Sequence, residues 1–134
     1  MVAFARTPAG LPGLPEAIAE AVVNSTGKGY IPVSPPIGCF GTFFSGSCTV
    51  SNILFCSIQF NAAELLGFSP AWMIALQNAG GGIGSMLRLS GAVAACATVN
   101  AVGKEGKILM LNSIPAAIMI LLTLLSMYCY QLIF

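Results

Sequence analysis

A dense group of polar residues inside a long segment without charge most constrains the fold of this chain. Residues 29–63 contain no acidic or basic side chain, and within them residues 46–52 read Gly-Ser-Cys-Thr-Val-Ser-Asn. Hydroxyls and amides are costly to bury in hydrocarbon without partners, so at membrane depth they usually line a path for a substrate or an ion. Glycine and proline residues flank the group, which favours a broken or re-entrant helix over a simple span. The pattern indicates part of a membrane transporter.

The composition supports a membrane location and excludes several classes of function. The chain is 57% hydrophobic and 7% charged, whereas soluble domains carry about 25% charged residues. A net charge of +1 provides no basic surface, so we expect no nucleic acid partner. Histidine and aspartate are both absent, which removes most metal sites and catalytic triads. We therefore expect no enzyme activity, no metal and no cofactor.

The five cysteines have no Cys-x-x-Cys spacing and are scattered through apolar sequence. We interpret them as small apolar residues at helix contacts rather than as disulfides or metal ligands. They are Cys39, Cys48, Cys56, Cys96 and Cys129.

The chain divides into a lead-in, residues 1–28, and a C-terminal membrane domain, residues 29–134. The lead-in ends in a short helix that begins near Pro15. This helix is too short to span a bilayer, and one interpretation is that it is the tail of a missing transmembrane helix. Residues 31–62 are interrupted by prolines and glycines, which predicts a re-entrant hairpin of two short helical arms that meet at residues 46–52.

Residues 70–102 are predicted to form a broken transmembrane helix. Glycines at positions 80, 81, 82 and 84 each cost about 1 kcal/mol against alanine in a helix, which favours an unwound linker between half-helices at 70–79 and 92–102. The alternative is that these glycines permit close helix packing.

Residues 108–133 are predicted to be the final, intact transmembrane helix, because residues 108–134 carry no charge. Tyr128 and Tyr130 suit a membrane interface, and Lys104 and Lys107 place the preceding loop in the cytoplasm. The expected fold class is thus an all-α membrane protein with a hairpin, a broken helix and one intact helix, an arrangement typical of half of an inverted-repeat secondary transporter.

Several motifs together resemble the C-terminal portion of the bacterial L-lactate permease family. They are the polar group at 46–52, Leu54-Phe55, Gln59, Leu66-Gly67 with Ser69-Pro70, the glycine-rich segment 80–86, and the segments 94–99 and 102–105, which together cover about residues 25–134. The resemblance implies a symporter that carries L-lactate, and related 2-hydroxy monocarboxylates such as glycolate, with protons. It also implies a multi-pass protein of the bacterial inner (plasma) membrane.

Because members of that family are several times longer, the resemblance implies that this chain is most of the second of two inverted repeats. A missing N-terminal half, or a homodimer partner, would complete the transporter. The alternative is a small non-transporting membrane subunit, or the relic of a truncated permease gene.

The expected substrate or ion path includes the polar side chains at the hairpin tip, although the same side chains are also suited to cap a helix. The glycine-rich break is expected opposite the tip. The residues assigned to this path are Ser47, Thr49, Ser51, Asn52, Gly81, Gly82 and Gly84.

Two charged residues are further candidates. The guanidinium of Arg88 is suited to pair with a carboxylate substrate, and the alternatives are snorkelling to the interface or pairing with Glu64. Glu64 is the candidate proton relay, whereas Glu105 lies between two lysines and is expected to be a solvated surface charge.

Overall fold

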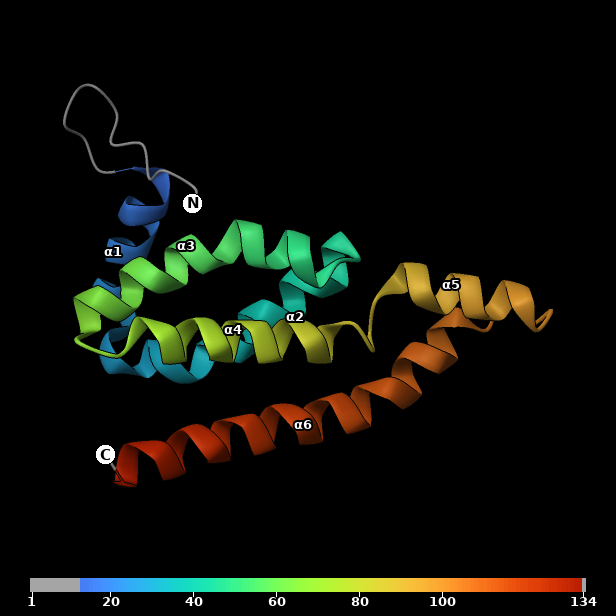
Figure 1. The fold of residues 1–134 in the computed structure, drawn as a ribbon. Coiled ribbons are helices and arrows are strands. Elements are labelled where there is room, and N and C mark those ends of the chain that lie inside the picture. The colour runs from blue at the N-terminus through green and yellow to red at the C-terminus, as the bar shows by residue number, and fades with distance from the viewer. Residues whose placement is uncertain (1–12, 134) are drawn as a thin grey trace.

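The computed structural model describes residues 13–133, which are almost entirely helical, with no strand in that range (Figure 1). The all-α fold expected from the sequence is therefore confirmed, while the start of the lead-in, residues 1–12, lies outside the described residues. The elements are α1 (Leu14–Thr26), the 3-10 helix η1 (Gly27–Val33), α2 (Ser34–Ser45), α3 (Cys48–Leu66), α4 (Pro70–Gly84), α5 (Leu89–Thr98) and α6 (Glu105–Ile133).

Helices α1 to α4 form a packed group, with α1 against α3 and with α2 and α3 both against α4. Small side chains allow this packing, since Ala19 of α1 and Ala62 and Ala63 of α3 are completely buried. Met73 of α4 fills the space beside them. The result is a compact apolar core at the end of the group where α3 passes into α4.

Helices α2 and α3 are joined by a turn of two residues at one end of this group. Gly46 has a φ of +70°, a left-handed conformation that costs glycine little, and it ends α2. Ser47 then caps α3, because its Oγ accepts a hydrogen bond of 3.5 Å from the backbone N–H of Val50. The turn lies at the start of the segment expected to form the hairpin tip.

The glycine-rich segment is helical, so the expected unwound linker at these glycines is wrong. Helix α4 continues to Gly84, and the chain leaves the helix only at Ser85–Arg88 before α5 begins. Helices α2 and α4 run in the same direction and approach so closely that a β-carbon on Gly80 would overlap the carbonyl of Pro35. One on Gly84 would overlap the carbonyl of Cys39. The close contact between helices offsets the helical cost of these glycines.

Helices α5 and α6 extend from the four-helix group, with α6 running back beneath α4 and α2 (Figure 1). Within the described residues, one helix is long and apolar enough to cross a membrane: Glu105–Leu132, in which an 18-residue stretch has a mean hydropathy of 2.3. Near its end the ring of Tyr130 stacks on Trp72 of α4 with centroids 4.2 Å apart. Most large apolar side chains of α6 are exposed, among them Met110, Leu121 and Leu125.

Candidate functional site

Polar side chains from three helices meet in the otherwise apolar contact between α2, α3 and α4. We call this set the polar cluster. Its members are Thr42 of α2, Cys48, Ser51, Asn52 and Gln59 of α3, and Gln77 and Asn78 of α4. Because the turn after α3 is short, α3 and α4 run antiparallel, which brings the first turns of α3 beside the last turns of α4.

The inner part of the polar cluster is a chain of fully buried hydrogen bonds. Ser51 Oγ donates to the carbonyl of Gly38 over 3.1 Å, and Gln77 Nε2 donates to Ser51 Oγ over 3.5 Å. Gln59 Nε2 in turn donates to Gln77 Oε1 over 3.1 Å. All three side chains are fully buried, so these bonds hold α2, α3 and α4 in one relative position.

Replacing Gln77 by leucine is expected to destabilise the fold by about 1–3 kcal/mol, because it leaves the buried amide of Gln59 without its partner. The double variant Gln59→Leu/Gln77→Leu should recover much of that loss, since two apolar groups then replace both partners. Thermal unfolding in detergent micelles measures both variants. A double variant no more stable than Gln77→Leu alone would show that the two amides do not act as a pair.

The outer part of the polar cluster lies at a more open edge. Asn52 Nδ2 donates to Asn78 Oδ1 over 2.8 Å, and the thiol of Cys48 lies 3.8 Å from the same oxygen. Asn52 Nδ2 also lies 3.7 Å from Cys48 Sγ. Asn78 is exposed, so this edge is open to a ligand or to a neighbouring protein surface.

Three buried oxygens of the polar cluster lack a hydrogen-bond partner: Thr42 Oγ1, Asn52 Oδ1 and Gln59 Oε1. The first two lie together beside Gly81 of α4. The place that a β-carbon on Gly81 would occupy lies 3.3 Å from Thr42 Oγ1, 3.7 Å from Asn52 Oδ1 and 2.8 Å from Cys48 Sγ.

Helix ends of both polarities meet around the polar cluster. Helices α2 and α4 end there, at Ser45 and Gly84, and α3 begins there. The start of α5 is also close, since a β-carbon on Gly46 would lie 3.1 Å from Ser90 Oγ. Carboxyl ends of helices carry partial negative charge and amino ends partial positive charge, so this region suits both a cation and an anion.

A groove of about 580 Å³ lies between the α2–α3 turn and α5, beside this meeting of helix ends. Its polar lining residues are Ser45 and Ser90, and most of the rest of its lining is apolar. A small organic acid would fit within such a volume.

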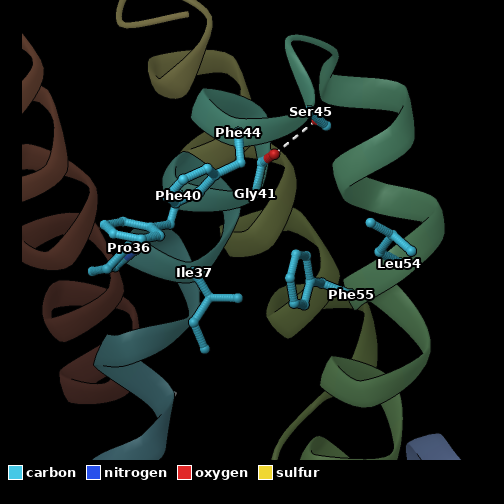
Figure 2. A pocket seen from close by; sticks show the side chains of 8 residues that line it. All are labelled: Pro36, Ile37, Phe40, Gly41, Phe44, Ser45, Leu54 and Phe55. Carbon is cyan, nitrogen blue, oxygen red and sulfur yellow. Dashed lines mark hydrogen bonds between the residues drawn. The ribbon is translucent and has the colours of Figure 1, made fainter.

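A second groove, of about 640 Å³, is apolar and shares no residue with the polar cluster. Figure 2 shows Phe40 and Phe44 of α2 on one side of this groove and Leu54 and Phe55 of α3 on the other. Ser45 Oγ is tied to the carbonyl of Gly41 over 2.7 Å, so little polar capacity is free within it. The groove is therefore suited to lipid or apolar side chains rather than to a polar substrate.

The tip residues chosen from the sequence occupy different environments. Ser47 caps α3 and Thr49 is exposed on its first turn. Ser51 turns inward to the buried chain, while Asn52 lies at the outer edge. The helix-cap interpretation thus applies to Ser47, whereas the lining of a substrate or ion path by these residues stays a prediction.

The three glycines assigned to the path also differ in their surroundings. Gly81 faces two of the unpartnered oxygens, and Gly84 is pressed against Cys39 of α2. Gly82 is exposed and has open space where a β-carbon would be. Within α4, Gly81 is therefore the glycine that the structure brings to the polar cluster.

The structure does not bring the two charged candidates together. Glu64 is exposed near the end of α3, and Arg88 is exposed at the start of α5, beyond the opposite end of α4 (Figure 1). The Arg88 side chain lies along α5, because a β-carbon on Gly91 would be 2.9 Å from its Nε. Their roles as substrate contact and proton relay stay predictions.

Five members of the polar cluster had no role in the path in the sequence analysis: Thr42, Cys48, Gln59, Gln77 and Asn78. Gln77 and Asn78 gave a usable signal, since adjacent amides interrupt an apolar helix just before the glycines. Thr42 gave none, as a single hydroxyl among apolar residues also suits an ordinary bond to its own helix.

Comparison with known proteins identifies the family. The sequence profile described as L-lactate permease matches residues 1–134. The chain belongs to the L-lactate permease family. Over 93 residues, 69% of the chain and 17% of each relative, it is 41% identical to an L-lactate permease of Salmonella typhi and 39% identical to one of Escherichia coli. No solved structure matches it.

A glycolate permease of Escherichia coli is also a relative, 32% identical over 113 residues, which are 81% of this chain and 20% of that protein. The chain thus spans about a fifth of the length of the L-lactate permease family members that it matches. The resemblance stated from the sequence motifs is confirmed.

Proposed function

We propose that this chain forms part of the substrate path of a permease that carries L-lactate, or a related 2-hydroxy monocarboxylate such as glycolate, across the bacterial plasma membrane with protons. Membership of the L-lactate permease family and the relatives' names support the substrate class. The single observation that carries the site is the polar cluster, where amides and hydroxyls meet between helix ends in a chain that is 7% charged. The chain is accordingly a transporter component and not an enzyme.

In this proposal, α2 and α3 form a re-entrant hairpin, and α4 and α5 form a broken transmembrane helix. The short turn at Gly46 and Ser47 and the break at Ser85–Arg88 support this arrangement, because both place the ends of helices beside the polar cluster. The substrate carboxylate binds at the amino ends of α3 and α5, near Asn52 and the groove lined by Ser90. The amides at the outer edge bond the 2-hydroxyl group.

The chain alone provides about a fifth of a typical family member, so a complete path requires either the remaining part of a permease or a second copy of this chain. The exposed apolar surface of α6 is available for such a contact or for lipid. The competing proposal is a membrane subunit that inserts but does not transport.

Uptake of labelled L-lactate into proteoliposomes tests the proposal, with and without an imposed pH gradient. The chain is reconstituted alone and together with the N-terminal part of a related permease. Saturable, gradient-dependent uptake in either preparation, with competition by glycolate, is the expected result. Correct insertion with no uptake in both preparations would favour the non-transporting subunit.

A further inference from the structure

We propose that the groove between the α2–α3 turn and α5, which we call the α5 groove, binds the C2 substituent of the substrate. The permease then accepts 2-hydroxy monocarboxylates with a large apolar substituent as well as L-lactate. Examples are 2-hydroxyisocaproate, which carries an isobutyl group, and phenyllactate, which carries a benzyl group. This assignment rests on the proposed function, in which the substrate carboxylate binds at the amino ends of α3 and α5.

The α5 groove has one polar end, which lies beside the proposed position of the carboxylate. Ser90 Oγ lies against the α2–α3 turn, since a β-carbon on Gly46 would be 3.1 Å from it. Within the described part of the chain this hydroxyl has no hydrogen-bond partner. Ser45 Oγ, the other polar group of the lining, is already bonded to the carbonyls of Gly41 and Ser47. A polar group of the ligand therefore finds its free partner at the Ser90 end.

The rest of the α5 groove follows one face of α5 away from this polar end. Its lining residues there are Val93, Ala94 and Ala97. They follow Ser90 at the spacing of three and four residues that places side chains on one face of a helix. At a rise of 1.5 Å per residue, the wall from Ser90 to Ala97 extends about 10 Å. An apolar wall of this length reaches well beyond a methyl group and suits a longer substituent.

The volume and the aromatic wall of the α5 groove both exceed what lactate requires. Its volume of about 580 Å³ lies in the range of pockets that enclose drug-sized ligands, whereas lactate carries only a methyl group at C2. Phe43 and Phe44 of α2 supply the second wall, with ring centroids 5.2 Å apart and planes at 83°. Phe44 is 74% exposed, so much of its ring is free to contact a benzyl group edge to face.

The combination of a free hydroxyl with an apolar wall selects the kind of ligand. The groove between α2 and α3 has an apolar lining in which Ser45 is already bonded, and it suits lipid. The α5 groove instead suits a molecule with a polar head and a short apolar tail. The relatives' names supply the head, because L-lactate and glycolate share the 2-hydroxy acid group and differ only in the C2 substituent. The substituent is thus the part of the substrate that the groove receives.

Inhibition of labelled L-lactate uptake measures how the permease ranks these acids. Proteoliposomes that hold the full chain and the N-terminal part of a related permease receive labelled L-lactate with unlabelled glycolate, 2-hydroxyisocaproate or phenyllactate. Each methylene group removed from water strengthens binding about fourfold. Because a groove covers only part of the substituent, both large acids should halve the initial rate at a concentration about tenfold below that of glycolate.

Phenylpropionate is the matched ligand control, because it has the ring and the carboxylate of phenyllactate but no 2-hydroxyl group. It should inhibit about tenfold less strongly than phenyllactate, since the amides at the outer edge of the polar cluster then lose their partner. Both acids are apolar enough to enter the bilayer and to dissipate a pH gradient. Equal inhibition by the two would therefore assign the effect to the membrane and overturn the proposal.

Ala97→Leu connects the size preference to the α5 groove, because the larger side chain fills the wall at the third turn of α5. It should raise the inhibitory concentration of phenyllactate about tenfold relative to that of glycolate, which has no substituent to displace. Ala95→Leu is the matched control, since Ala95 lies on the same helix outside the groove lining. It should leave the ratio of the two inhibitory concentrations at the parent value. Both alanines are exposed, so neither substitution overpacks a core.

L-Lactate uptake that glycolate inhibits but the two large acids do not would overturn the assignment and show that protein or lipid covers the apolar wall. Equal effects of Ala97→Leu and Ala95→Leu would overturn it as well, because the groove would then not set the preference. A complete lack of L-lactate uptake would contradict the proposed function, and this assignment with it. The two failures are therefore distinguished by whether glycolate-sensitive uptake of L-lactate occurs.

Discussion

Gly80→Ala is expected to destabilise the four-helix group by about 3 kcal/mol, in the upper part of the range measured for overpacked cores. The added β-carbon would overlap the carbonyl of Pro35 and lie 2.7 Å from its Cα. These are backbone atoms, which cannot move aside as a side chain can. Helices α2 and α4 would have to separate, and the buried chain from Ser51 to Gln77 would be pulled apart. Thermal unfolding in detergent, followed by circular dichroism, measures the change.

Gly82→Ala is the matched control, because Gly82 lies in the same helix two residues away and a β-carbon there meets nothing within 4 Å. Alanine is the better helix former by up to about 1 kcal/mol, so this variant should be as stable as the parent or more stable. If both variants lowered the unfolding temperature equally, the cost would arise from the helix itself, and the close contact of α2 with α4 would not explain the glycines.

The glycine-rich segment shows where reasoning from the sequence alone fails. Local propensity correctly identified a residue type that disfavours helices, but it could not distinguish a glycine that breaks a helix from one that permits close packing. That distinction depends on Pro35 and Cys39, which lie on α2, more than forty residues away in the sequence. The true break follows at Ser85–Arg88, where no glycine occurs.

Other features depended on local signals and were predictable. The helical class followed from long apolar segments without charge, and the end of α2 followed from a glycine before a capping serine. The polar cluster was predictable only in part. Asn52 was identified because it belongs to a polar group, whereas Thr42 matters only once α2, α3 and α4 are packed together.

Asn52→Ala is expected to reduce L-lactate uptake about 10- to 100-fold in a permease that contains this chain, while membrane insertion is unchanged. Asn52 is the one tip residue from the sequence analysis that bonds to a second helix at the open edge, through Asn78 over 2.8 Å. Loss of its hydrogen bond to the substrate 2-hydroxyl, which leaves that hydroxyl without a partner, costs about 1–3 kcal/mol, and each 1.4 kcal/mol is tenfold. Initial rates of labelled lactate uptake in cells without other lactate permeases provide the measurement.

Asn61→Ala provides the control, because Asn61 is the same residue type on the same helix but near the end of α3 that is remote from the tip. It should leave uptake near the parent level. Normal uptake by Asn52→Ala would show that the outer edge of the polar cluster does not contact the substrate. Equal losses in both variants, with less protein in the membrane, would instead show that α3 tolerates neither change. Both substitutions remove the same amide group from α3. A loss of uptake in Asn52→Ala alone would therefore locate the substrate contact at the start of α3, where α2 and α4 end.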